Sequence, residues 1–240
     1  MKILLLDIET APNIADVWDL WNQNVSLNQL RESSYMLCWA AKWLDSSIMM
    51  FGSIWDGFGM VDEIHTLIEE ADVVVTYNGD RFDLTTLNKE FILAGFTPPA
   101  PYKSVDVYKI IKQNFRFTSN KLQYVGEILT GGGKVKHEGH DLWVKVRAGD
   151  KAAQAQMEEY CKGDVSLLQE VFLVVQPWAK TLPNYKLYVG SECPKCDNGD
   201  LEKRGFAYTL SGTYQRFRCK NCGGWSKHNK RLAAVDVTGI

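Results

Sequence analysis

The chain has 240 residues, of which 45% are hydrophobic and 23% charged, a composition typical of globular proteins with a buried core. No run approaches the roughly 18 to 20 apolar residues that a membrane span needs, and the N-terminus has no basic region followed by a long apolar segment. We therefore expect a soluble protein that contacts no membrane and works in the cytoplasm of a bacterium or of a phage-infected host.

The net charge of −2 conceals an uneven distribution. Residues 103–151 and 186–240 each carry ten basic and five acidic side chains, whereas the rest of the chain carries seven basic and nineteen acidic ones. Charge runs of this kind often form only solvated faces. Together with acidic residues around a metal, however, two basic segments would suit a polyanionic substrate.

The first predicted elements are mainly strands. The apolar run "KILLLDIE" is typical of a strand buried on both faces. The runs "YMLCWAAKWL" and "SIMMFGSI", separated by "DSS", predict a hairpin. The segment "VDEIHTLIEEA" has helical apolar spacing, and it leads into "DVVVTYN", a fourth predicted strand.

The following region is predicted to be mostly helical, with a basic, glycine-rich loop "TGGGKVKHEGH" in its middle. We expect helices over residues 83–94, 107–113, 120–129, 151–161 and 164–175. Strand pairs followed by alternating helices and strands predict an α/β fold, with a mixed sheet flanked by helices.

Two carboxylates, Asp7 and Glu9, interrupt the first apolar run. Residues two apart on a strand point to the same face, so these two share one site. Burying an unpaired carboxylate is costly, and both therefore need compensation. Asp83, after the fourth strand, and Asp164, in the last helical pattern, could join them. Four carboxylates around one site require a cation, and Mg²⁺ and Mn²⁺ prefer such oxygen ligands.

Tyr160 precedes Asp164 by four residues, so both share one helix face if the helix continues through Gly163. Each residue also has a purely structural interpretation. Asp83 could simply cap its helix, and Tyr160 could simply pack in the core.

The motifs "DIET", "NGDRFD" and "YCKGD" resemble, in order and rough spacing, the three motifs of the DEDDy-type 3′→5′ exonucleases. These enzymes belong to the RNase H-like superfamily, and the resemblance is closest to proofreading domains of family B DNA polymerases and to free-standing phage or bacterial relatives. It spans residues 1–178. Each motif alone arises often by chance, whereas all three in order are a specific signal.

The resemblance implies an RNase H-like fold and a two-metal mechanism. It implies that two Mg²⁺ or Mn²⁺ ions are bound by Asp7, Glu9, Asp83 and Asp164, with Asp7 bridging them. Tyr160 would orient the attacking water. Paired ions of this kind stabilise both the attacking and the leaving oxygen of a phosphodiester.

The resemblance also implies that Asn78 and Phe82 lie near the 3′-terminal nucleotide, with Phe82 packing rather than contacting it. The expected substrate is single-stranded DNA, cleaved to nucleoside monophosphates in DNA replication or repair. No polymerase palm or fingers would fit in this length, so proofreading would need a separate DNA polymerase or replication protein as partner. The alternatives are an RNA-trimming exonuclease and a non-catalytic nucleic-acid-binding or replication-scaffold protein.

Other polar residues of this region have simpler interpretations. His140 lies too far before the last acidic motif to replace Tyr160, as a histidine does in a related subgroup, and we expect it with His137 in a solvated loop. Asp80 is expected in an exposed turn. Asp106 would either support a metal ligand or cap a helix.

The C-terminal segment contains two paired cysteine motifs, "CPKC" and "CKNC", separated by 22 residues. The spacing of Cys193, Cys196, Cys219 and Cys222 is typical of a structural Zn²⁺ site, and the alternating segment between them predicts the hairpin of a zinc ribbon. A unit of this size is too small to hold a core unaided, so zinc binding would be coupled to its folding. We expect an exonuclease domain over 1–178, a linker over 179–189 and the ribbon over 190–240.

Basic residues alternate with aromatic residues along the ribbon, as in proteins that bind single strands. The same pattern would arise if the aromatics covered a tiny core and the charges faced water. We therefore expect either nucleic acid or a protein such as a polymerase as its partner. Of the two cysteines outside the ribbon, Cys38 and Cys161, the second is expected to be buried.

Overall fold

The computed structural model describes residues 1–240 except 58, 134–137, 181, 183–191, 210–211 and 235–240. The chain forms two compact units, Lys2–Leu173 and Val174–Ile240, the latter together with Met1. None of the helices in the described ranges is long and apolar enough to cross a bilayer.

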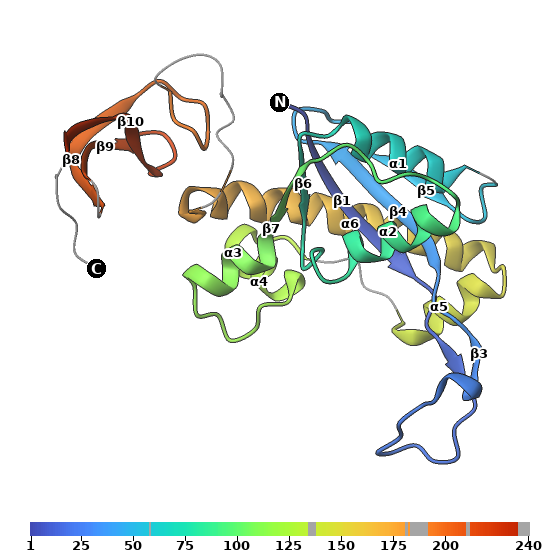
Figure 1. Ribbon diagram of the computed structural model, residues 1–240. Helices are drawn as coiled ribbons and strands as arrows, with labels where there is room; N and C mark the ends of the chain where they lie inside the picture. The colour runs from blue at the N-terminus through green and yellow to red at the C-terminus, as the bar shows by residue number, and fades with distance from the viewer. Residues whose placement is uncertain (58, 134–137, 181, 183–191, 210–211, 235–240) are drawn as a thin grey trace. The chain divides into compact units, whose positions relative to one another are not determined.

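The larger unit contains a five-stranded sheet with the order β5-β4-β1-β6-β7 (Figure 1). Its strands are β1 (Ile3–Thr10), β4 (Met36–Trp43), β5 (Met50–Ser53), β6 (Val73–Thr76) and β7 (Lys103–Asp106). β1 is antiparallel to β4 and β4 to β5, whereas β1, β6 and β7 are parallel. The predicted mixed sheet and its β4–β5 hairpin are confirmed, while the short strand β7 was not predicted.

Helices cover both sides of this sheet (Figure 1). They are α1 (Met60–Glu70), α2 (Asp83–Leu93), α3 (Val107–Asn114), α4 (Leu122–Thr130), α5 (His140–Arg147) and α6 (Lys151–Val175), followed by the 3₁₀ helix η2 (Gln176–Trp178). Helix α5 was not predicted, because its segment adjoins the glycine-rich loop.

The alternation of side chains along β1 gives its two faces different chemistry. Leu4, Leu6 and Ile8 are buried in a core that also contains residues of α1 and α2. The intervening Asp7 and Glu9 must therefore point to the opposite face of the sheet. That face is covered by α6, which places polar groups beside the two carboxylates.

Helix α6 is one 25-residue helix, whereas the sequence predicted two. Glycine in a helix interior costs about 1 kcal/mol, but the buried side chains on either side of Gly163, such as Met157 and Val165, outweigh that cost. A second glycine lets α4 approach α6 closely. A Cβ at Gly126 would lie 2.6 Å from Leu167 Cδ1.

An arm of residues 11–35 follows β1 and was not predicted. It contains β2 (Ile14–Ala15), the 3₁₀ helix η1 (Leu27–Gln29) and β3 (Leu30–Glu32), with β2 and β3 paired. Large apolar side chains of this arm face solvent, with Trp18 96% exposed and Leu27 88% exposed. An ion pair between Glu32 and Arg147 connects the arm to α5.

The smaller unit contains a three-stranded antiparallel sheet with the order β10-β9-β8. Its strands are β8 (Leu201–Thr209), β9 (Gly212–Cys219) and β10 (Trp225–Ala234). The predicted hairpin is β8–β9, and β10 adds a third strand. Of the predicted linker, the structure describes only residues 179, 180 and 182.

Candidate active site and cysteine cluster

Three of the predicted acidic residues lie together. Asp7 and Glu9 on β1 and Asp164 on α6 each offer a carboxylate oxygen, and these oxygens all lie within 4.8 Å of one another. Asp164 is buried, and the other two are partly buried. Carboxylates this close repel one another unless a cation neutralises them. Their hard oxygen atoms and their spacing fit a divalent ion such as Mg²⁺ or Mn²⁺.

A buried thiol lies beside this cluster. Cys161 Sγ lies 3.7 Å from the main-chain oxygen of Asp7 and 3.9 Å from its Oδ2. Burial raises the pKa of Cys161 well above its ordinary value, and the neighbouring Cys38 and the charges of Asp7 and Glu9 raise it further. The group is therefore a neutral thiol that can donate to Asp7. Its predicted burial is confirmed.

Asp83 supports the strand that carries the cluster. Its Oδ1 accepts a hydrogen bond from the Ile8 main-chain N–H at 3.2 Å. The pairing of β1 with β6 ends at Leu5, so the N–H of Ile8 lies beyond the paired residues and is bound by Asp83 instead. Asp83 is the first residue of α2, and the N-cap position that the sequence allowed for it belongs to Phe82. It contacts the backbone between Asp7 and Glu9 without belonging to the cluster of three.

Tyr160 lies on the same helix as Asp164, one turn earlier. The helix continues through Gly163, so the two residues share a face. The Tyr160 ring is buried and meets Trp143 of α5 edge-on, with ring centres 6.1 Å apart. Trp143 was not predicted to lie here, because a lone tryptophan beside a loop has no characteristic spacing.

Asn78 occupies a strained turn after β6. Its φ of +66° lies in the left-handed region, and its N–H donates to Asp106 Oδ1 at 2.8 Å. The Asp106 carboxylate therefore holds this turn and makes no N-cap bond at α3. Burial raises the pKa of Asp106, and the negative charge of Asp80 raises it further. The hydrogen bond from Asn78 and the positive charge of Lys109 act to lower this pKa.

Asp80 differs from its expected exposed position. It is partly buried, and Ser104 Oγ and Lys109 Nζ both donate to its carboxylate. Burial alone would raise the pKa of Asp80, but these bonds and the charges of Lys109 and Lys103 outweigh it and lower the pKa. Phe82 also differs from expectation, since its side chain is 42% exposed instead of packed.

The structure describes one of the two histidines of the predicted loop. His140 is the first residue of α5, so it does not lie in a loop, but it is exposed to solvent as expected. His137 falls outside the described residues. Neither histidine belongs to a metal-ligating group found among the residues that the structure describes.

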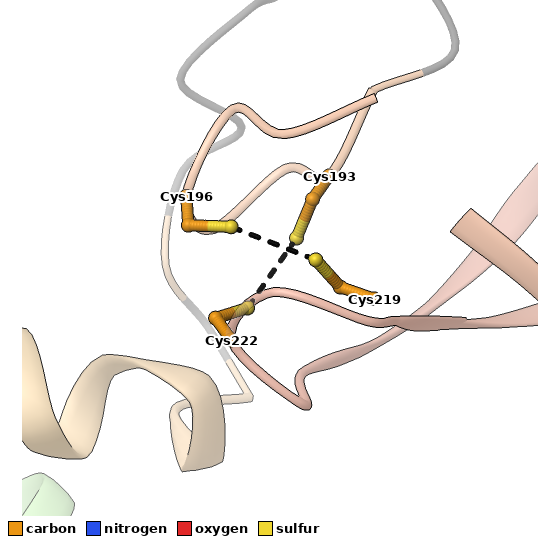
Figure 2. Close-up of side chains that lie close together, drawn as sticks. All are labelled: Cys193, Cys196, Cys219 and Cys222. Atoms are coloured by element: carbon orange, nitrogen blue, oxygen red, sulfur yellow. Dashed lines mark hydrogen bonds between the residues drawn. The ribbon is translucent and has the colours of Figure 1, made fainter. Parts of the chain in front are cut away.

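The four ribbon cysteines also converge (Figure 2). Their sulfur atoms lie within 4.8 Å of one another, with 3.7 Å between Cys193 and Cys222 and 3.6 Å between Cys196 and Cys219. All four are free thiols, so the arrangement fits a tetrahedral Zn²⁺ ion. Burial acts to raise the pKa of Cys196, but bonds from Asn221, the Asn198 backbone and neighbouring thiols lower it to about 7.

Comparison with known proteins agrees with this fold. The RNase_H_2 family model of the RNase_H superfamily matches residues 53–175, just over half of the chain, a range that includes Asp83, Tyr160 and Asp164. The chain belongs to the RNase H superfamily. A search of curated proteins gives no match.

Many solved structures are similar to this chain. One is the family B DNA polymerase from the hyperthermophilic archaeon Pyrobaculum calidifontis, with a TM-score of 0.51 and 16% identity. The match covers 74% of this chain and 25% of the polymerase chain. The likeness therefore concerns the fold of one part of that polymerase.

Proposed function

We propose that this protein is a divalent-metal-dependent 3′→5′ exonuclease that releases nucleoside monophosphates from single-stranded DNA during replication or repair. The observation that carries this proposal is the convergence of Asp7, Glu9 and Asp164 on one face of an RNase H-like sheet. These residues come from the first and third of the motifs that resemble DEDDy-type exonucleases. A separate DNA polymerase or replication protein is the proposed partner.

Each residue of the site has a distinct proposed role. Asp7, Glu9 and Asp164, with Asp83 beside them, would hold two Mg²⁺ or Mn²⁺ ions. Such ions lower the pKa of a bound water and stabilise charge on the attacking and leaving oxygens. Asp83 also fixes the β1 backbone through Ile8. The Tyr160 hydroxyl would orient the attacking water from the helix face that it shares with Asp164.

Two residues are proposed to contact the 3′-terminal nucleotide. The main-chain N–H of Asn78 donates to Asp106, and this bond fixes the backbone from which the Asn78 side chain projects. The exposed ring of Phe82 could stack on a base. The preference for DNA over RNA rests on the motif resemblance alone. Discrimination between the two requires a contact to the 2′-hydroxyl, and none of the residues named above is assigned that contact.

The test is a cleavage assay with 5′-labelled single strands of DNA and RNA of the same sequence, each with Mg²⁺ or Mn²⁺. We expect a DNA ladder shortened from the 3′ end. Asp7→Asn should slow cleavage at least about a hundredfold, the scale of losing a group that stabilises developing charge. Asp45→Asn, which alters an exposed carboxylate in the β4–β5 turn, is the matched control and should cleave normally.

Three outcomes would contradict parts of this proposal. Full activity of Asp7→Asn would exclude the metal assignment. A ladder with RNA alone would make the protein an RNA-trimming exonuclease. Binding without cleavage in either metal would make it a non-catalytic nucleic-acid-binding protein.

A further inference from the structure

The register of the ribbon sheet places its basic and aromatic side chains on particular faces. Partners opposite each other in an antiparallel sheet share a face, as do residues two apart on one strand. Strands β9 and β10 supply three such pairs, Arg218–Trp225, Arg216–Lys227 and Tyr214–Arg231. These six residues form three successive rungs on one face, and we call them the ladder.

Contacts between rungs confirm this shared face. The Arg216 guanidinium lies 4.9 Å from the centre of the Trp225 ring, and Lys227 Nζ lies 3.9 Å from the centre of the Tyr214 ring. Arg216 Nε donates to the Arg204 main-chain oxygen at 2.9 Å, which fixes the guanidinium while other N–H donors remain for a ligand. Trp225 is 48% exposed, so part of its ring is accessible.

The ladder carries positive charge that the ribbon does not neutralise. One acidic residue, Glu202, lies opposite Arg218 on the ladder face, but its carboxylate pairs with Arg204 at 3.0 Å. Asp200 pairs with Lys220 at 3.1 Å. Among the residues that the structure describes, no carboxylate forms an ion pair with Arg216, Arg218 or Lys227. A face with such an excess attracts polyanions.

The opposite face of the same sheet has a different composition. On β8 and β9 it carries one cation, Lys203, which is paired across the strands with Phe217. Phe217 in turn lies near His228, with ring centres 6.5 Å apart. Both faces therefore carry aromatic rings, and the ladder differs by its larger number of cations beside them.

We infer that the ladder binds single-stranded nucleic acid, with Tyr214 and Trp225 stacking on bases and the cations contacting phosphates. In a duplex the bases stack on one another and offer no faces to these rings. An acidic protein would use the cations without needing the rings. The inference deepens the proposed function, since a second contact on the same chain raises the local concentration of the strand at the larger unit.

The test measures binding of fluorescein-labelled oligonucleotides to the zinc-loaded full chain by anisotropy, without Mg²⁺ or Mn²⁺. The probes are single-stranded DNA, single-stranded RNA of the same sequence and duplex DNA. Arg216→Ala and Trp225→Ala alter the ladder. Lys203→Ala and Tyr208→Ala are the matched controls, because both residues lie on the opposite face of the sheet.

We expect Trp225→Ala to weaken single-strand binding at least about fivefold, the lower range for losing one stacked aromatic. Arg216→Ala should also lower the slope of log affinity against log salt by about 0.7, while Trp225→Ala leaves that slope unchanged. Both controls should bind within about twofold of the unaltered chain, and duplex should bind more weakly than either single strand.

Equal affinity of ladder and control variants, or equal loss in all four, would overturn the inference and leave the face to a protein partner. Zinc content shows whether each variant is folded. If Trp225→Ala loses zinc, then Trp225→Phe, which keeps a ring, and Trp225→Leu, which does not, provide the comparison, with weak binding expected only for Trp225→Leu. Because the readout needs no cleavage, a chain that cleaves nothing but binds through the ladder would refute the proposed exonuclease and keep this inference.

Discussion

The two clusters of candidate metal ligands differ in what surrounds them. Asp7, Glu9 and Asp164 lie on a strand and a helix whose other side chains fill the core of the larger unit. Three of the four cysteines lie on loops and the fourth, Cys219, ends β9, in a unit with almost no core. Among the described residues between 192 and 233, those that are buried are Cys193, Gly212, Cys219 and Gly224.

This difference separates two uses of a metal. The carboxylates are held by packing that exists before an ion arrives, so a metal there would serve chemistry. The cysteines have no comparable packing, so zinc would supply the free energy that holds their loops together. Variants that alter one cluster or the residues around it therefore test whether the other cluster responds.

The largest effect should come from Cys219→Ser, which removes a buried ligand from the cysteine cluster. Structural zinc contributes about 10–16 kcal/mol of apparent binding free energy in small zinc domains. Hydrogen exchange should show loss of protection in β8–β10 and unchanged protection in β1, β4 and α6, with loss of bound zinc. Cys38→Ala removes a buried thiol from the larger unit and should keep the zinc. Simultaneous loss of protection in both units would contradict their independence.

A smaller effect should follow from Asp83→Ala, which leaves the Ile8 N–H without its acceptor. An unsatisfied buried donor costs about 1–3 kcal/mol, measurable by urea unfolding. Asp83→Asn keeps an acceptor and should be nearly as stable as the unaltered chain, yet it should cleave as poorly as Asp83→Ala because it lacks the charge. If the asparagine variant is as unstable as the alanine variant, the bond to Ile8 is not what Asp83 contributes to the fold.

Packing beneath the carboxylates can be altered at Gly126. Because its Cβ would lie 2.6 Å from Leu167, Gly126→Ala should lower the free energy of unfolding of the larger unit by about 1–3 kcal/mol. Gly133→Ala is the control, since its Cβ would meet Glu127 at an ordinary 3.8 Å. Equal urea midpoints for the two variants would show that α6 adjusts without cost.

The smallest effect concerns pH. Burial raises the pKa of Asp106 above its ordinary value of 3.8, so the folded chain holds this proton more tightly than the unfolded chain does. The stability from this group is full below pH 3.8 and is lost as pH rises through the raised pKa. Asp106→Asn keeps an acceptor for Asn78 and should gain stability relative to the unaltered chain between acid and neutral pH. A constant difference in urea midpoint across that range would contradict the assignment.

Much of the larger unit could be predicted because three of its strands are mainly apolar. β1, β4 and β6 follow apolar runs, and the acids on β1 stand out against them. The prediction of two helices in place of α6 was wrong. It relied on the low helix propensity of Gly163, whereas the helix is held together by packing that only the folded chain provides. β7 was not predicted because only two of its four residues are buried, which is too few to produce a recognisable apolar pattern.

Parts of the site depended on partners that a sequence does not specify. The bond from Ile8 to Asp83 exists because the β1–β6 ladder ends early, which is a property of register. The ladder on the ribbon likewise depends on register shifts between β9 and β10. The exposure of Trp18 was not predicted either, because apolar residues are ordinarily expected inside.

Cys161 on α6 contacts Asp7 on β1 although 154 positions separate them. Translation proceeds from the N-terminus, so the first two carboxylates leave the ribosome long before α6 does. Until that helix has emerged, the nascent chain lacks the third carboxylate and the thiol beneath it. A chain released too early would therefore carry the two acids of β1 without the helix that brings a third carboxylate beside them.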